Sequence, residues 1–450
     1  MFSIYTMYIK YFTLCLSYKI YISFLQKNVN VLLGGGSMGK LFLKICLFAI
    51  GTVLLFAAKT THAEERQQNN YPIILVNGFA GWGREEMLGV KYWGGVHDIQ
   101  EDLKRNGYTV HTAAVGPVSS NWDRACELYA QINGGTVDYG AAHAEKHGHN
   151  RFGRTYSGFA PNWSETNKVH LVGHSMGGQT IRTLVQLLKE GSFEEKNYVN
   201  NHPNTNISPL FEGEKSYVHS GTTLATPHNG TTLADGSLLL PFVKDLLITA
   251  ASFGGNNNLS LYDFKLDQWG IKKNTGESFF QYTDRILNSS LWKNTKDISQ
   301  WDLSTDGAKE LNNWVKAQSD VYYLSYSGHA SQAAPITGLH LPHITMNKVL
   351  MGNAFFLGSY ARYEENRPLI DTSWWQNDGV VNTNSMIAPS SNATVNSNEP
   401  LQIGKWNHIE TKTNWDHLDM VGLSVSDTLG FSSIQEFYRT IAEKLSRLPK

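Results

Sequence analysis

The chain has 450 residues, of which 41% are hydrophobic and 17% are charged, and its 38 Lys and Arg nearly balance its 39 Asp and Glu for a formal net charge of -1. A near-neutral chain offers no electrostatic footprint for nucleic acid, so a nucleic-acid partner is not expected. Without low-complexity runs or internal repeats, this length suits an enzyme-sized globular protein.

The first segment is predicted to be a targeting sequence rather than part of the fold. From Met38 a short basic stretch leads into an apolar run, Ile45–Ala58, which is followed by Thr-His-Ala at 61–63. A basic region, an apolar region and a small-residue cleavage site in this order are typical of a secretory signal peptide. We therefore predict a signal peptide over residues 38–63, a mature chain from about residue 64, and an extracellular location.

Residues 1–37 precede this signal, and we interpret them as an untranslated leader. Glycine codons begin with GG, so the Gly-Gly-Gly-Ser before Met38 is what a purine-rich ribosome-binding site would yield on translation. The alternative is a membrane anchor over Tyr5–Phe24, but two lysines make this a poor spanning segment. Only Cys126 of the three cysteines lies in the mature chain, so no internal disulfide is expected.

The mature chain opens with a strand, a loop and a helix. Tyr71–Val76 is an apolar run that predicts a buried strand, and a glycine-dense loop follows at 77–83. A helix is predicted over Val96–Asn106, ended by Gly107, and a second strand over Thr109–Ala114. A loop so rich in glycine can bring backbone N–H groups close to a substrate oxygen.

The most informative motif is a Gly-x-Ser-x-Gly turn at residues 173–177. An apolar run, Val169–Val172, precedes it, and an amphipathic helical pattern follows it. In a strand-turn-helix unit of this kind the serine backbone is strained, which lifts the hydroxyl clear of the sheet above a helix N-terminus. The bare pattern is expected roughly 0.3 times by chance in such a chain, so its setting carries the interpretation. We predict that Ser175 is a nucleophile.

Further strands are predicted over Tyr217–Ala225 and Val321–Tyr326, and two stretches, at about 122–161 and 233–302, have the character of insertions. Strands that alternate with helices indicate a mostly parallel sheet with helices on both faces. We therefore expect one α/β catalytic domain over residues 64–450.

A serine nucleophile needs a base and an acid that orients the base. In the α/β-hydrolase fold these follow the serine in the order acid, histidine. Asp378 lies in an acidic turn where an exposed loop would follow a strand, and His417 lies in the sequence Asn-Trp-Asp-His-Leu. We predict that both complete a triad with Ser175 that attacks an ester carbonyl. The backbone N–H groups of Phe79 and Met176 are expected to hold the oxyanion.

Four longer motifs carry a resemblance to a known family. They are NGFAGWGREEMLGVK (77–91), VGPVSSNWDRACELYAQINGGTVDYGAAHAEKHGHNRFG (115–153), YDFKLDQWG (262–270) and NDGVVNT (377–383). From about residue 71 to its end, the chain resembles the zinc-containing thermoalkalophilic lipases of bacilli and the related staphylococcal lipases. The resemblance implies an α/β-hydrolase fold, and hydrolysis of triacylglycerols at an oil–water interface by the three triad residues.

The resemblance also implies a mobile helical lid, which we place at about Leu233–Asn257. This segment has too many apolar residues for one exposed helix face. An ordinary core helix is the alternative interpretation. A lid explains the excess, because its apolar face is buried when the lid is closed and meets lipid when it is open. Transient contact with a membrane or lipid surface is therefore expected.

Three histidines, His143, His147 and His149, cluster within seven residues. Such a cluster alone is more often a solvated polar loop than a ligand set. The resemblance implies that zinc is held by two of them, His143 and His149, together with Asp123 and Asp297. Four N and O ligands with no open position suit a structural ion rather than a catalytic one.

A calcium site is the second metal site that the resemblance implies. Its ligands map to the backbone carbonyl of Thr345, to Asp419, and to Ser424, where the family pattern has an aspartate. Because serine lacks the hard carboxylate, loss of calcium or reduced calcium affinity is expected, with Asp427 as an alternative ligand. Asn77 is a second departure, since a histidine commonly precedes the Gly-Phe of the oxyanion loop. The oxyanion donor is a backbone N–H, so catalysis is expected to survive this change.

Two other classes of function compete with this interpretation. A secreted binding protein on a degenerate hydrolase scaffold would lack a triad member, and none is missing. A zinc metallohydrolase would need a base-bearing helix such as His-Glu-x-x-His, and the sequence contains none. Within the esterases, a carboxylesterase or phospholipase stays open as the alternative, because acyl-chain preference depends on the shape of the cleft.

Overall fold

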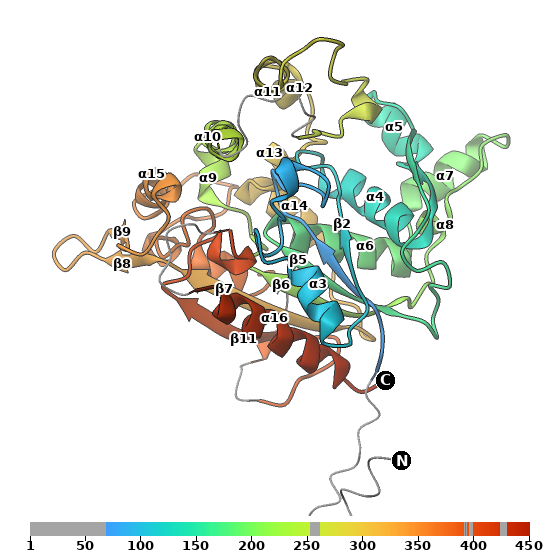
Figure 1. The fold of residues 1–450 in the computed structure, drawn as a ribbon. Helices are drawn as coiled ribbons and strands as arrows, with labels where there is room; N and C mark the ends of the chain where they lie inside the picture. Colours follow the sequence, from blue (N-terminus) through green and yellow to red (C-terminus); the bar gives the residue numbers. More distant parts are fainter. Residues whose placement is uncertain (1–68, 253–261, 391, 393, 396–398, 424–429) are drawn as a thin grey trace, which may run out of the picture. The chain divides into compact units, whose positions relative to one another are not determined.

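A seven-stranded sheet forms the centre of the computed structural model, in the order β10-β11-β7-β6-β5-β1-β2 (Figure 1). All of its pairings are parallel. The structure describes residues 69–252, 262–390, 392, 394–395, 399–423 and 430–450, so the predicted leader and signal peptide lie outside the described residues. The strands of the sheet are β1 (Ile73–Val76), β2 (Val110–Ala113), β5 (Val169–His174), β6 (Val218–Leu224), β7 (Tyr322–His329), β10 (Thr394–Val395) and β11 (Trp406–Thr413).

Helices and two short hairpins make up the rest of the regular structure. The hairpins are β3 (Gly135–Asp138) with β4 (Phe152–Tyr156), and β8 (Ser331–Ala333) with β9 (His340–Pro342). The α-helices are α3 (Ile99–Arg105), α4 (Asn121–Asn133), α5 (Ala141–His147), α6 (Met176–Glu190), α7 (Phe193–Asn201), α8 (Pro209–Glu212), α9 (Thr232–Asp235), α10 (Leu239–Ser252), α11 (Phe279–Leu287), α12 (Leu291–Asn294), α13 (Ser299–Asp302), α14 (Thr305–Trp314), α15 (Lys348–Leu357) and α16 (Gly430–Ser446). The 3-10 helices are η1 (Met87–Gly89), η2 (Asp267–Trp269), η3 (Thr372–Trp374), η4 (Thr383–Met386) and η5 (Asp419–Val421).

The central strands are buried on both faces, and in β1 this burial explains a continuous apolar sequence. In β1 the side chains of Ile73 and Leu75 belong to one hydrophobic core, and those of Ile74 and Val76 belong to another. Residues of α4 and α6 share the second core, and residues of α3 and α16 share the first. Because successive side chains of a strand point to opposite faces, the sheet is covered on both sides. The predicted fold class is confirmed.

The first helix begins later than the sequence pattern predicts. It starts at Ile99 rather than Val96, because the Asp98 side chain caps it by accepting a hydrogen bond from the Glu101 amide at 3.2 Å. Val96 is 75% exposed and belongs to the preceding loop. The prediction of a helix was correct and its first boundary was wrong.

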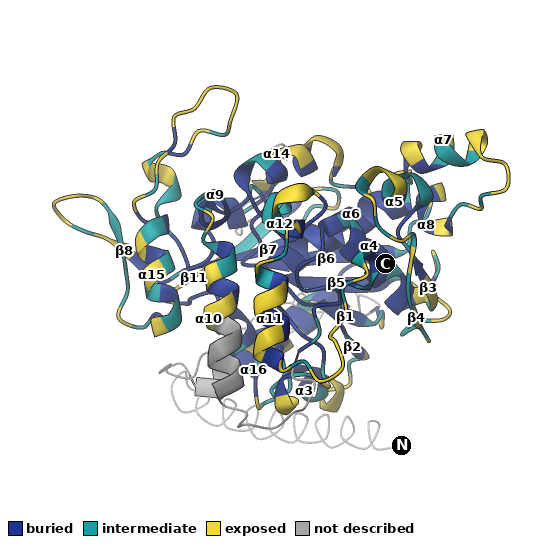
Figure 2. Cartoon of the chain, turned by 90° about the horizontal axis from the view of Figure 1, so that it is seen from above, coloured by how far each residue is buried: buried dark blue, intermediate teal, exposed yellow. Residues whose placement is uncertain are grey.

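The two stretches with the character of insertions contain distinct sets of elements. The stretch 122–161 holds most of α4, which packs against α6, and then β3, α5 and β4. The stretch 233–302 holds α10 to α13, and α10 and α11 run side by side (Figure 2). Residues 253–257 of the predicted lid lie outside the described residues. Asn69–Leu448 pack as one compact unit. No helix in the described part of the chain is both long enough and apolar enough to cross a membrane.

Candidate active site and metal site

Ser175 lies at the sharp turn between β5 and α6. Its backbone has φ 55° and ψ -132°, a conformation that costs a non-glycine residue energy. The turn is tight on both sides: a Cβ on Gly173 would lie 2.5 Å from the carbonyl carbon of Gly177, and a Cβ on Gly177 would collide with the Val76 carbonyl. Glycine is therefore required at both flanking positions, and the predicted strand-turn-helix geometry is present.

Asp378 and His417 form a buried hydrogen-bonded pair. The His417 Nδ1–H donates to Asp378 Oδ2 at 2.7 Å, and the His417 amide donates to the Asp378 carbonyl at 3.0 Å. The other carboxylate oxygen of Asp378 accepts from the amides of Val380 at 2.9 Å and Val381 at 2.7 Å. The aspartate is thus held in one orientation, with one oxygen directed at the imidazole.

The environment of Asp378 differs from the exposed loop that the sequence predicts. The residue is completely buried, and it does not follow a strand of the sheet directly. Strand β7 ends at His329, and the β8–β9 hairpin and α15 intervene before the chain returns, with the Ala330 amide donating to the Asn377 carbonyl at 3.0 Å. Asp378 thus bonds to His417 as a triad acid would, but the predicted setting, an exposed loop directly after a strand, is wrong. The β8–β9 hairpin and α15 separate Asp378 from β7 in sequence, and the chain then returns to the end of that strand.

One cavity contains both the serine and the histidine. It is lined mainly by apolar and aromatic side chains, and two residues of α10, Leu239 and Phe242, lie in its wall. Both are buried, so the described part of α10 covers the cavity. The residues around Ser175 and His417 in this cavity include Phe79, Trp82, Tyr92, Pro227, Leu303, Val380, Val381 and Val421.

The two predicted oxyanion donors, Phe79 and Met176, belong to two different elements near Ser175. Met176 is the first residue of α6, and Phe79 lies in the loop after β1 and lines the cavity. Neither backbone amide has a hydrogen-bond partner within the described residues. The Ala80 amide fixes the loop by donating to the Pro117 carbonyl at 2.8 Å. Both N–H groups are therefore available for an anionic oxygen.

Arg124, on α4, holds the loop after β1 in place through hydrogen bonds. It is fully buried and donates to the carbonyl of Asn77, to the carbonyl of Gly116 at 2.6 Å and to Thr180 Oγ1 at 2.8 Å. Burial lowers its pKa to about 10. The Asn77 side chain adds a second support, since its Oδ1 accepts from the Val115 amide at 3.1 Å. Asn77 thus has a structural role through its amide group.

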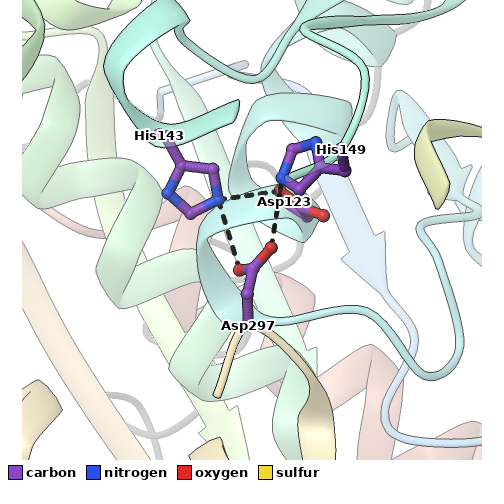
Figure 3. Close-up of side chains that lie close together, drawn as sticks. All are labelled: Asp123, His143, His149 and Asp297. Atoms are coloured by element: carbon purple, nitrogen blue, oxygen red, sulfur yellow. Dashed lines mark ion pairs between the residues drawn. The ribbon is translucent and has the colours of Figure 1, made fainter. Parts of the chain in front are cut away.

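A separate group of four side chains converges at a site that could hold a metal ion (Figure 3). Asp123 comes from α4, His143 from α5, His149 from the loop after α5, and Asp297 from the segment before α13. One ligand atom from each lies within 4.8 Å of all the others. The individual N···O distances are 3.2 to 3.8 Å. Donors about 2.0–2.1 Å from a tetrahedral ion lie about 3.3 Å apart, which matches this spacing.

Donor chemistry at this site also fits a metal. Asp123 Oδ1, His143 Nε2, His149 Nε2 and Asp297 Oδ2 are buried without a hydrogen-bond partner. The His149 Nδ1 lies 2.9 Å from the Asn150 carbonyl, which fixes the proton on Nδ1 and leaves Nε2 as a donor of electrons. Burial and then the charge of Asp297 raise the pKa of Asp123. Two carboxylates in one buried site need positive charge between them, which a divalent cation would supply.

Comparison with known proteins gives the family. A family model described as "Lipase-like, C-terminal domain" matches residues 69–450. The chain belongs to this lipase family. It is 40% identical over 390 residues to Lipase 1 of Staphylococcus aureus strain MRSA252, a match that covers 85% of this chain and 55% of that protein. The chain thus spans about half the length of the staphylococcal lipases that it matches, and the resemblance inferred from the motifs is confirmed.

Solved structures agree with this assignment. EstA from Clostridium botulinum aligns with a TM-score of 0.80 and 49% identity, covering 87% of this chain and 91% of that one. Lipase 1 from Pelosinus fermentans aligns with a TM-score of 0.77 and 54% identity, covering 84% of this chain and 99% of that one.

The residues expected to bind calcium in this lipase-family chain are only partly described. Asp419 Oδ2 accepts from the Asp416 amide at 2.8 Å, and Thr345 Oγ1 lies 3.4 Å from the Asn414 carbonyl, so the two segments are neighbours. Ser424 lies outside the described residues. Within the described residues, the Asp123 group is the one set of three or more His, Cys, Asp or Glu with converging ligand atoms. The calcium site stays a prediction.

Three buried residues near the triad did not emerge from the sequence as site residues. Asp416 precedes His417, and its carboxylate accepts from the amides of Asn347 at 2.7 Å and Leu418 at 2.9 Å. Burial raises the pKa of Asp416 to about 6. Tyr92 and His174 bond to each other beside Ser175. His174 lies inside the serine motif, but only the folded chain brings Tyr92 to it.

Proposed function

We propose that the chain is a secreted triacylglycerol lipase that works through Ser175, His417 and Asp378. The observation that carries the proposal is that the strained Ser175 and the Asp378-bonded His417 line one apolar cavity. An apolar, largely enclosed cleft with a few polar groups at one point suits an ester with a long acyl chain.

Each residue of the triad has a defined task in the proposed reaction. His417 Nε2 takes the proton from Ser175 Oγ as the oxygen attacks the ester carbonyl, and the same proton is then given to the leaving alcohol. Asp378 keeps the Nδ1–H of the histidine oriented and stabilises the imidazolium that forms. The amides of Phe79 and Met176 bind the oxyanion, and each would contribute on the order of 10² to 10³ in rate. Water then repeats the sequence on the acyl-enzyme.

The lid function assigned to α10 extends this proposal. Leu239 and Phe242 lie in the cavity wall, so the described arrangement leaves little room for an acyl chain. Movement of α10 away from the cavity would admit the substrate and turn these apolar side chains toward a lipid surface. A lipid ester at an oil–water interface is the substrate that this arrangement favours.

We also propose that the Asp123, His143, His149 and Asp297 group holds a structural zinc ion. Two imidazole nitrogens and two carboxylate oxygens at tetrahedral spacing are a donor set that zinc accepts. The ion would supply binding free energy that joins the three chain segments bearing its ligands. None of the four residues lines the cavity that contains Ser175.

Hydrolysis of a series of triglycerides and p-nitrophenyl esters with increasing acyl length tests the proposal. A triacylglycerol lipase cleaves emulsified long-chain triglycerides. Activity confined to short, soluble esters would identify a carboxylesterase instead, and preference for phosphatidylcholine vesicles would identify a phospholipase. N-terminal sequencing of protein from the culture medium tests secretion, with a mature end near residue 64 expected.

A further inference from the structure

Next to Ser175, two buried side chains, Tyr92 and His174, connect the loop after β1 to the loop that carries His417. The Gly78 amide lies 3.0 Å from the Tyr92 hydroxyl, the hydroxyl lies 2.6 Å from His174 Nδ1, and His174 Nε2 lies 3.1 Å from the His417 carbonyl. Tyr92 is 6% exposed and His174 is 1% exposed.

The donors in this chain of hydrogen bonds can be assigned without ambiguity. A carbonyl oxygen only accepts, so the His417 carbonyl requires the proton of His174 on Nε2. Burial, followed by the nearby His417, lowers the pKa of His174 well below its ordinary value, so the ring is neutral and Nδ1 accepts. The Tyr92 hydroxyl must then donate to Nδ1, which leaves its oxygen to accept from the Gly78 amide. Every donor in this series of hydrogen bonds then has an acceptor, and all three bonds run in the same direction, from the Gly78 amide to the His417 carbonyl.

Packing reinforces the same junction. A Cβ on Gly78 would lie 2.7 Å from the Ser175 Cβ and 2.9 Å from the Tyr92 hydroxyl, so the loop before Phe79 is fitted closely against both. The rings of His174 and His417 lie 4.6 Å apart between centroids. His174 therefore touches the base through its ring and holds the base's backbone through Nε2.

We infer that Tyr92 and His174 are positioning residues that fix the oxyanion loop and His417 relative to each other. The inference rests on the proposed hydrolase function. Neither residue exchanges a proton with the substrate in this scheme. Each acts through Phe79 or His417, so disruption of these hydrogen bonds should lower the rate of the chemical step more than it weakens substrate binding.

Tyr92→Phe and a matched pair of His174 variants test this inference with p-nitrophenyl butyrate below its solubility limit. Tyr92→Phe is expected to lower kcat about tenfold and to change KM by less than about threefold, because misplacement of the reacting groups affects mainly the chemical step. His174→Gln can place an amide N–H near the position of Nε2, whereas His174→Asn cannot reach it. We expect Gln to retain at least about tenfold more of kcat than Asn.

Tyr262→Phe is the matched control for Tyr92→Phe. Tyr262 is also a buried tyrosine of the same core, but its hydroxyl has no hydrogen-bond partner within the described residues, so kcat should be unchanged. In the His174→Asn background, Tyr92→Phe should cause little further loss of kcat, because the hydrogen bond to the His417 carbonyl is already absent.

The possible results separate the inference from the proposed function. Fold-losses that simply multiply in the double variant, or a Tyr92→Phe enzyme with the kcat of Tyr262→Phe, would overturn the positioning role. A wild-type protein that hydrolyses no ester and takes no label from an organophosphate would instead overturn the proposed hydrolase function.

Discussion

At the residue scale, Arg124 and Glu127 of α4 are buried and hold two backbone segments, the loop after β1 and the segment at Gly116. Arg124 donates to the Asn77 and Gly116 carbonyls, while Glu127 Oε2 accepts from the Gly116 amide at 2.5 Å and Oε1 accepts from the Tyr139 hydroxyl at 3.1 Å. Both side chains are buried away from water, so the hydrogen bonds that hold this loop are formed against an unfavourable desolvation free energy.

Glu127 makes stability depend on pH in a predictable direction. Burial raises its pKa to about 7, despite the Gly116 hydrogen bond, from an ordinary value of 4.5. Between these values the folded protein binds a proton that the unfolded chain has released, so the free energy of unfolding falls as pH rises through this window, by about 3 kcal/mol at most. Glu127→Gln should remove this slope.

Urea unfolding of the Glu127→Gln variant at pH 5 and pH 8 measures the effect. The variant should lose less stability between the two pH values than the wild type does. Glu443→Gln, at an exposed position of α16, is the control and should keep the wild-type slope. An unchanged slope in Glu127→Gln would show that this carboxyl is ionised throughout the range.

Ser175→Ala tests the nucleophile directly. We expect hydrolysis to fall by on the order of 10⁴ or more, because the serine and its base act as one unit. The thermal midpoint should change little, since the hydroxyl is small and alanine keeps the backbone. Rates on p-nitrophenyl butyrate and labelling by an organophosphate give the readouts. Residual activity near that of wild type would remove Ser175 from the mechanism.

At the scale of elements, α10 contributes Leu239 and Phe242 to the wall of the cavity. Phe242→Ala should raise kcat/KM on a soluble short-chain ester by about two- to fivefold, because access no longer waits on movement of the helix. The increase of activity above the solubility limit of the substrate should shrink in parallel. Phe280→Ala, on the neighbouring α11 with 56% exposure, is the control and should leave both rates unchanged. Loss of activity on the soluble ester would indicate that Phe242 forms part of the acyl site.

The sequence predicts those elements whose cause is local. β1 is a continuous apolar run, β5 and β6 mix apolar or β-branched residues with His, Gly and Ser, and the turn at Ser175 has its own motif. The predicted bounds of these strands lie within a few residues of the observed ones. The sequence pattern places the start of α3 too early, because the apolar Val96 extends the helical pattern although it faces solvent ahead of the cap, Asp98. The setting of Asp378 depends on the return of the chain after a hairpin and a helix, and the contact of Tyr92 with His174 joins residues 82 positions apart. No local sequence pattern encodes either.

At the scale of the whole described unit, the four-residue metal group joins parts of the chain that the sheet does not connect. Asp123 belongs to α4, His143 and His149 belong to α5 and the loop after it, and Asp297 lies between α12 and α13. Further contacts tie the last segment in place, since the Ser299 amide donates to the Val118 carbonyl at 3.1 Å. A metal ion would therefore stabilise α4 relative to these segments, and with α4 the Arg124 hydrogen bonds to the loop after β1.

The last prediction separates that stabilising role from chemistry. His149→Ala should lower bound zinc and reduce the thermal midpoint by about 5 °C or more, because the folded state loses the binding free energy of the ion. Turnover at moderate temperature should stay within about tenfold of wild type, since no ligand lines the cavity. His147→Ala is the matched control: it lies two residues away, outside the converging group, and should keep its metal. Chelation of the wild type should reproduce the loss, and added zinc, but not calcium, should restore it. This ligand set would be excluded if the purified protein contained no zinc, or if both variants lost equal amounts of zinc and stability. A stable but inactive His149→Ala protein would instead show that the ion takes part in the reaction.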